Sequence, residues 1–278
     1  MTDFDKLRKE TLEFEFSVVI LNRCMSNEQY AKLPASPENK KEDVRLTMLL
    51  KDTLPGIIKN AEEEKFELII VDNGSGDHCL IELINFQRSQ PNCRLILNGN
   101  NTGCSGGWNQ GLKLARGEYI CFCASDYIVK TPNFLKILQE PMLKDPLVAE
   151  TGPRVAVSNS ECLGMAFNEY DGCEVTYVAL DCGMLKKSAL EKIGYIDEML
   201  YPYMGEDQEL GLALCNAGYK VIKKDLPDSI HLGQQSIGLL WSQFGDNPEV
   251  TQMWERNKAY MKNKYKEYFN RRMLERGF

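Results

Sequence analysis

The sequence predicts an α/β fold with a mostly parallel central sheet. Four short apolar runs rich in Val, Ile and aromatic residues recur in the first half of the chain, and segments with helical spacing separate them. Runs that are apolar throughout are typical of strands covered on both faces, as in parallel sheets. Alternation of strand and helix favours right-handed crossovers between such strands. The four strands are expected at residues 16–21, 67–72, 94–97 and 119–123.

Helices are expected between these strands. Residues 42–64 carry apolar side chains at helical spacing around a break at Pro55, and further helices are expected near residues 80–84 and 108–115. The polar stretch 27–43, with two prolines, is expected to be a long loop. Beyond residue 150 the pattern weakens. It predicts a strand at 175–180, helices at 187–193 and 207–217, and a mostly charged helix at 250–272.

Composition excludes several classes of protein. The 278 residues carry 40 acidic and 33 basic side chains, a net charge of -7, and no dense block of Lys or Arg, which argues against nucleic acid as a partner and against an anchor to anionic lipid. No apolar run approaches the roughly 20 residues of a membrane span, and residues 1–15 are too charged for a secretory signal. We expect a cytoplasmic protein without a transmembrane segment, with a peripheral position at the inner membrane surface left open.

The ten cysteines are scattered through a long chain, several of them inside apolar runs. This distribution is typical of reduced core thiols and not of a disulfide framework. Cys121 and Cys123 would share one face of a strand, but no second pair and no neighbouring His completes four ligands, so no structural zinc site is expected.

The loops that follow the predicted strands are where a ligand would bind, because open parallel sheets bind ligands at the carboxyl ends of their strands. These loops begin at Asn22, Asp72, Asn98 and Ala124. The DNGSGD segment at 72–77 offers a carboxylate and flexible backbone at such an end, yet its residues are equally typical of an Asx turn that caps the next helix. The segment 100–109 (NNTGCSGGWN) precedes a helix and could approach an anion, or could simply cap and pack that helix.

Three further groups are candidates for chemistry. Asp126 ends the fourth strand, where a lone Asp could hold a metal ion or form a turn. Glu206 and Asp207 open a helix, where the helix dipole favours acids on structural grounds alone. His231, one of two histidines, lies in a loop rich in Gly, Gln and Ser.

Taken in order, these segments resemble the inverting glycosyltransferases of family 2, which have the GT-A fold. The resemblance spans residues 16–238 and is carried by SVVILNR at 17–23, VDNGSGD at 71–77, the segment 100–126, the segment 194–221 with its Glu-Asp pair, and His231. It is strongest to the rhamnosyltransferase-like branch of bacterial sugar transferases. It implies a Rossmann-like GT-A domain at residues 14–235, with residues 236–278 as a helical extension packed on it.

The resemblance also implies roles for individual residues. Asp207 would be the general base, with Glu206 beside it, and Asp126 would be the last Asp of a DxD motif that holds Mn²⁺ or Mg²⁺ on the donor diphosphate, with His231 as an additional ligand. Asp72 would contact the nucleotide base. The other donor-binding residues would be Asn22, Asn73, Asn101, Gly103, Asn109 and Ser125. Ala124 stands where the first Asp of the motif is expected, which leaves one carboxylate and puts the metal requirement in question.

The function implied is transfer of a hexosyl or deoxyhexosyl group from a nucleotide-diphosphate sugar to a saccharide, lipid-linked, peptide or small-molecule acceptor, with inversion at the sugar. Two alternatives stay open. One is a sugar-nucleotide-binding protein with impaired catalysis, which Ala124 favours; the other is a nucleotidyltransferase, although the basic phosphate loop that it would need near the first strand is missing. Aromatic residues of the last helix could dock it on the domain or form a homodimer contact.

Overall fold

The computed structural model describes residues 14–32, 42–61, 64–156, 171–232 and 248–275, with side chains to residue 271. Its centre is an eight-stranded sheet in the order β3-β2-β1-β4-β10-β6-β11-β8. β1 (Phe16–Asn22), β2 (Phe66–Asp72), β3 (Cys93–Leu97) and β4 (Tyr119–Ala124) pair in parallel, as the sequence predicts. The other half is mixed, with β6 (Val148–Gly152), β8 (Glu174–Val175), β10 (Cys182–Lys186) and β11 (Lys220–Lys223).

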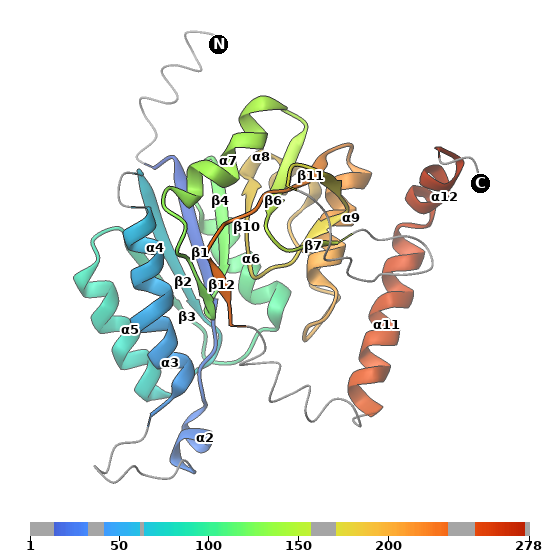
Figure 1. Ribbon diagram of the computed structural model, residues 1–278. Helices are drawn as coiled ribbons and strands as arrows, with labels where there is room; N and C mark the ends of the chain where they lie inside the picture. Colours follow the sequence, from blue (N-terminus) through green and yellow to red (C-terminus); the bar gives the residue numbers. More distant parts are fainter. Residues whose placement is uncertain (1–13, 33–41, 62–63, 157–170, 233–247, 276–278) are drawn as a thin grey trace.

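Helices cover both faces of the sheet, because its central strands are apolar on both sides (Figure 1). On one face pack the segment 44–60, α5 (Asp77–Ser89) and α7 (Phe134–Lys144). On the other pack α6 (Cys104–Leu114), α8 (Lys187–Ile193) and α9 (Glu206–Asn216). The strands therefore end in loops along one edge of a three-layer sandwich.

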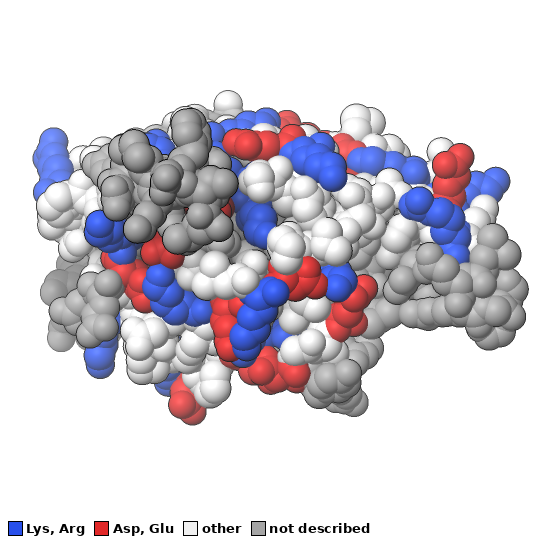
Figure 2. Space-filling view, turned by 90° about the horizontal axis from the view of Figure 1, so that it is seen from above, with Lys and Arg blue, Asp and Glu red and all other residues white. Residues whose placement is uncertain are grey.

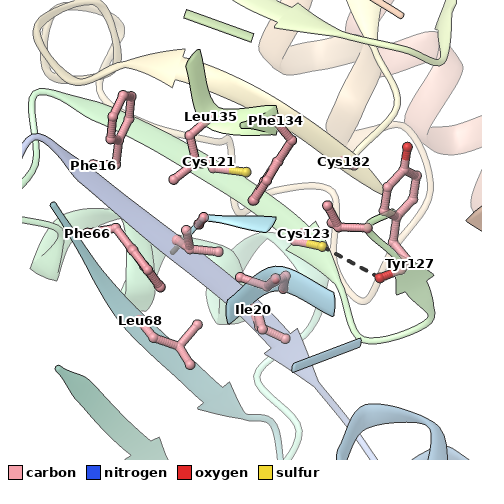
Figure 3. Packing of buried hydrophobic residues seen from close by; sticks show 14 of the residues in the cluster. Phe16, Ile20, Phe66, Leu68, Cys121, Cys123, Tyr127, Phe134, Leu135 and Cys182 are labelled. Carbon is pink, nitrogen blue, oxygen red and sulfur yellow. Dashed lines mark hydrogen bonds between the residues drawn. The ribbon is translucent and has the colours of Figure 1, made fainter. Parts of the chain in front are cut away.

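The cysteines of the described residues are free, and most lie in this core. Figure 3 shows Cys121, Cys123 and Cys182 packed among Phe16, Ile20 and other apolar side chains of the first face. Burial raises the pKa of the Cys93 thiol to about 12 and that of Cys182 well above its usual value. They are core thiols, as predicted.

Several predicted elements differ in detail. The segment 44–60 is continuous across Pro55: α3 (Val44–Met48) runs through a π-helical turn at Leu49–Thr53 into α4 (Leu54–Asn60). The wider turn accommodates a residue that lacks an N–H group. Within the stretch predicted as a loop, α2 (Asn27–Ala31) forms behind a Ser26 capping box, and residues 33–41 lie outside the described part. The strand expected at 175–180 is split between β8 and β9 (Tyr177–Val178), which belong to different sheets.

Two small sheets flank the main one. β7 (Val155–Ala156) pairs with β9, and β5 (Tyr127–Ile128) pairs antiparallel with β12 (Ile230–His231). The second pairing matters for the site, because it brings His231 opposite Tyr127 and next to the end of β4.

The predicted last helix forms as two, α11 (Pro248–Lys264) and α12 (Lys266–Glu275). Their apolar residues Met261, Tyr265 and Phe269 pack on Leu200 and on Leu212 of α9. The extension therefore packs against the helix that begins with the Glu-Asp pair (Figure 1).

No helix among the described residues is long and apolar enough to cross a membrane. On the face shown in Figure 2, the described Lys and Arg residues are interspersed with Asp and Glu, so that face carries no extended field of one sign.

Candidate active site

The loops after β1 and β2 are locked together by buried polar contacts. Asn22 Nδ2 donates to Asp72 Oδ1 at 2.9 Å, and the Ser75 backbone N–H donates to Asp72 Oδ2 at 2.9 Å, with the Ser75 hydroxyl donating to Oδ1 at 2.5 Å. Asn22 and Asp72 have no exposed surface. The Asp72 carboxylate holds a turn, as in the other interpretation of this motif, and its contact with a nucleotide base stays a prediction.

Asn73 joins this turn to the loop after β3. Its Nδ2 donates to Asn101 Oδ1 and to the Gly103 carbonyl, and its Oδ1 accepts from Thr102 N–H at 2.9 Å. Gly103, at a φ of +81°, ends this loop, and Asn101 is exposed beside it. Asn73 is thus a buried residue that connects the two loops by hydrogen bonds, and the exposed Asn101 remains available to a ligand.

Asn109 is buried and contacts the segment before α9, and its predicted place in the donor pocket stays a prediction. Its Nδ2 donates to the Ile196 carbonyl and to Glu198 Oε1, and its Oδ1 accepts from Ile196 N–H. Helical spacing places Asn109 on the face of α6 that meets the segment before α9. The sequence motif could not reveal these contacts, because the partners are 87 and 89 residues away in the chain.

Asp126 and His231 lie together, as the resemblance implied. The short β5–β12 pairing brings Asp126 Oδ1 to 3.3 Å from His231 Nε2, and Leu232 N–H donates to the Asp126 carbonyl. Ser125, next to Asp126 in the chain, is partly exposed, and its carbonyl accepts a hydrogen bond from the Thr53 hydroxyl.

Sequence reasoning missed two residues of this cluster, Asp181 and Arg154. Asp181 Oδ2 lies 3.3 Å from His231 Nδ1 and forms an ion pair with the Arg154 guanidinium. Asp181 is 4% exposed. Burial raises its pKa, while the charges of Arg154 and His231 oppose that rise. No motif marked these residues; the signal available for Asp181 is that it directly follows the strand expected at 175–180, where a turn residue is also common.

The Asp126–His231 pair fits a divalent cation. Two neighbouring ligands of an octahedral ion with bonds of about 2.1 Å lie about 3 Å apart, close to the 3.3 Å between Oδ1 and Nε2. Within the described residues no three His, Cys, Asp or Glu side chains gather around one point. The protein therefore offers two ligands, and oxygens of a diphosphate and water would have to supply the others.

Glu206 and Asp207 form the first turn of α9, behind a left-handed Gly205. Asp207 Oδ1 accepts from the Gln208 N–H at 2.8 Å, and Glu206 Oε2 is buried with no hydrogen-bond partner among the described residues. Burial first, and then the charge of Glu206, raise the pKa of Asp207 to about 7. A carboxylate in this range can accept a proton near neutral pH and release it again, which is what a general base requires.

Asp207 also interacts electrostatically with carboxylates of neighbouring segments. The charge of Asp181 also raises the pKa of Asp207, and the charge of Asp207 in turn adds to the burial that raises the pKa of Glu150 in β6. On the other side, Cys104 N–H donates to the Pro202 carbonyl at 2.7 Å, which attaches α6 to the segment before Glu206.

Helix α11 holds the backbone that leads into the Glu-Asp pair. Asn257 Nδ2 donates to the carbonyls of Tyr203 and Met204 at 3.2 and 2.9 Å, and Arg256 donates to the Tyr201 carbonyl at 2.7 Å. Met204 has a φ of +80°, a conformation that costs a non-glycine residue free energy unless its surroundings enforce it. The C-terminal extension is therefore part of the framework of this site.

Comparison with known proteins identifies the family of this chain and agrees with its fold. The family model described as "Glycosyl transferase family 2" matches residues 49–194, more than half of the chain. The chain belongs to glycosyl transferase family 2. The matched region contains β2 to β4, Asp72, Asp126 and Asp181, and ends before Glu206 and His231.

Relatives and a solved structure support the family and the fold. The chain is 27% identical over 233 residues to the poly-β-1,6-N-acetyl-D-glucosamine synthase of Staphylococcus aureus (strain MSSA476), covering 74% of this chain and 55% of that protein. It is 26% identical over 168 residues to the glycosyltransferase GlyG of Streptococcus pneumoniae serotype 4, covering 60% and 50%. The chain thus spans about half the length of these relatives.

The crystal structure of GalNAc-T7 with UDP, GalNAc and Mn²⁺ superposes with a TM-score of 0.58 at 16% identity, covering 77% of this chain and 43% of that one. The predicted GT-A fold and family 2 membership are confirmed. The rhamnosyltransferase-like branch stays a prediction, since none of these proteins carries that name.

Proposed function

We propose that this family 2 glycosyltransferase inverts the sugar that it transfers, moving a hexosyl or deoxyhexosyl group from a nucleotide-diphosphate sugar to a saccharide, lipid-linked or peptide acceptor. One observation carries the proposal: an acid–imidazole pair suited to a cation and an acid with a pKa of about 7 face the same edge of the sheet. The first suits the leaving diphosphate, and the second suits the acceptor.

In this reaction the oxygen of the acceptor hydroxyl attacks the anomeric carbon, and Asp207 accepts the proton of that hydroxyl. The bond to the diphosphate breaks on the opposite face, so a single displacement inverts the sugar. Glu206 keeps the pKa of Asp207 raised through its charge. Asp126 and His231 would hold a divalent cation, which neutralises charge on the leaving diphosphate when bound.

The donor would lie against the exposed residues of the edge. Asn101 and Ser125 are accessible there, whereas Asn22, Asp72 and Asn73 are buried and act by fixing the loops that carry the exposed groups. We propose that the turn at 72–75 faces the nucleotide through its backbone and that Asp72 preserves the shape of that turn.

The first test is donor turnover. The chain is incubated with UDP-, GDP- and TDP-linked sugars, with and without Mn²⁺, and release of the nucleoside diphosphate is measured. The names of the similar proteins make UDP-linked N-acetylhexosamines the first donors to try, and the motif resemblance adds deoxyhexose donors. Asp207→Asn is the matched variant: hydrolysis or transfer by the wild type, and its loss in the variant with donor binding retained, is the expected result.

One specific observation, Ala124 in place of a motif Asp, favours a second candidate, a sugar-nucleotide-binding protein with impaired catalysis. Binding of a nucleotide sugar in calorimetry without turnover under any condition would support it. Release of pyrophosphate from a nucleoside triphosphate would instead indicate a nucleotidyltransferase.

A further inference from the structure

Asp181 stands directly across from the position where the motif carboxylate is missing. β10 pairs antiparallel with β4 in the register Cys182 to Cys123, so the next pair along is Asp181 and Ala124. The Ala124 N–H donates to the Asp181 carbonyl at 2.7 Å, which fixes this register at the end of the strand. A carboxylate is therefore present beside position 124, but it is supplied by the neighbouring strand.

The Asp181 side chain is buried and held by specific contacts, unlike a charged side chain on the surface. It is 4% exposed, its Oδ1 accepts from the Cys182 N–H at 2.7 Å, and its Oδ2 faces His231 Nδ1 at 3.3 Å. On the other side of the imidazole ring, Nε2 faces Asp126 Oδ1 at the same distance of 3.3 Å. His231 thus lies between two carboxylates, one at each ring nitrogen.

The ring can bind a cation through Nε2 only if its remaining proton is on Nδ1. That proton needs an acceptor, and a carboxylate on the far nitrogen both fixes the tautomer and strengthens the ligand. Asp181 Oδ2 has the required place. Arg154 Nη1 lies 2.5 Å from the same Nδ1, and a guanidinium can only donate, so in this arrangement Nδ1 accepts and Nε2 carries the proton toward Asp126.

We propose that Asp181 compensates for the missing motif carboxylate as a positioning residue and not as a ligand: it accepts the Nδ1 proton of His231 and so directs the Nε2 lone pair to a divalent cation shared with Asp126. Arg154 stabilises the competing tautomer, in which Nε2 is protonated and cannot bind the cation. The inference rests on the proposed function, because the cation would be the one that accompanies the donor diphosphate.

The first experiment measures Mn²⁺ binding in the presence of UDP by electron paramagnetic resonance of the free ion, a readout independent of turnover. Asp181→Ala is expected to weaken Mn²⁺ binding about 10- to 100-fold. Asp181→Asn keeps an acceptor for the Nδ1 proton without its charge, so its loss should be smaller. Asp145→Asn is the matched control, because it removes one negative charge from a surface ion pair with Lys220 outside the site.

A second experiment observes the tautomer itself and uses variants that change the cluster in opposite directions. The chain has two histidines, so ¹⁵N-labelled histidine gives two sets of ring signals, and His78→Gln identifies those of His231. Arg154→Gln should shift His231 toward the Nδ1–H form in the metal-free protein and strengthen Mn²⁺ binding. If Asp181→Ala fails to fold by circular dichroism, Asp181→Asn and Arg154→Gln still decide the matter.

Wild-type Mn²⁺ affinity in both Asp181 variants, or an unchanged His231 tautomer in Arg154→Gln, would overturn the inference. So would a wild type that binds no Mn²⁺ with UDP, even if it transferred sugar, and that result would leave the proposed function standing. Mn²⁺ binding that depends on Asp181, in a protein that turns over no donor, would support the inference and refute the proposed function.

Discussion

Replacing Asp207 by Asn should lower turnover and raise stability together. Asn has the same shape, and its Oδ1 can still accept from the Gln208 N–H, so the fold of the turn should survive. The variant cannot take the acceptor proton, and turnover should fall about 100-fold or more. The gain in stability follows from the pKa of the wild-type carboxyl.

The pKa of Asp207 is about 7 in the folded protein, against 3.8 for the unperturbed group, because burial and the charge of Glu206 disfavour ionisation. Below pH 4 the carboxyl is protonated in both states, so it does not affect the free energy of unfolding. Between pH 4 and 7 the unfolded chain loses this proton while the folded chain keeps it, so wild-type stability falls as pH rises. A difference of about 3 units corresponds to at most ~4 kcal/mol, reached near pH 7 and constant above it.

The assay is a set of denaturant melts of wild type and Asp207→Asn from pH 3.5 to 8.5. The stability difference in favour of the variant should be near zero at the acid end, grow through pH 4–7 and then level off. A variant that is less stable than wild type at pH 8, or a difference that does not change with pH, would refute the assignment of a raised pKa to Asp207.

Three further outcomes are expected. Glu206→Gln removes the charge that raises the pKa of Asp207, so the acid limb of the kcat–pH profile should move to lower pH, and a limb that stays near 7 would assign the shift to burial alone. Asn257→Ala leaves two loop carbonyls without their donor and should cost about 1–3 kcal/mol in a denaturant melt, whereas Glu255→Ala, at an exposed surface pair, should stay within about 0.5 kcal/mol. Gly111→Ala would place a Cβ 2.3 Å from a Val19 methyl and should lower the free energy of unfolding by about 1–3 kcal/mol. Gly106→Ala in the same helix, where the nearest atom would be 3.4 Å away, should be neutral or stabilising. Equal stability of the two variants in a denaturant melt would contradict the packing of α6 on β1.

The first half of the fold was predictable because its pattern is local. β1 to β4 appear within a residue of the expected bounds, since apolar runs of that length report burial on both faces. β8 and β9 were predicted as one strand, because the sequence of 175–180 does not reveal that two different sheets divide it. The mixed half of the sheet depends on pairings such as β10 with β4, whose partners are about 60 residues apart.

The site shows the same division between local motif and distant contact. Asp126 stood out at a strand end, Glu206 and Asp207 at a helix start, and His231 through the family resemblance. The structure leaves all four partly buried, and it brings Asp126 next to His231. Asp72 has an equally conspicuous motif, yet its carboxylate is used by its own turn. Residue type and spacing identify polar groups at a ligand-facing edge, but they do not reveal which of these groups form hydrogen bonds with the neighbouring loops.

The segment 197–205 explains why the Glu-Asp pair could be singled out in the sequence and the contacts that support it could not. It places Glu206 and Asp207 through contacts with two elements that are remote in sequence: α6, through the Pro202 carbonyl, and α11, through Asn257 and Arg256. The family model ends at residue 194, before this segment. A charged C-terminal helix gives no hint in its own pattern that an amide on its buried side supports a left-handed Met204, three residues before Asp207. Because that conformation needs support from outside the loop, the C-terminal extension belongs to the machinery of the site and is more than a cover for its apolar surface.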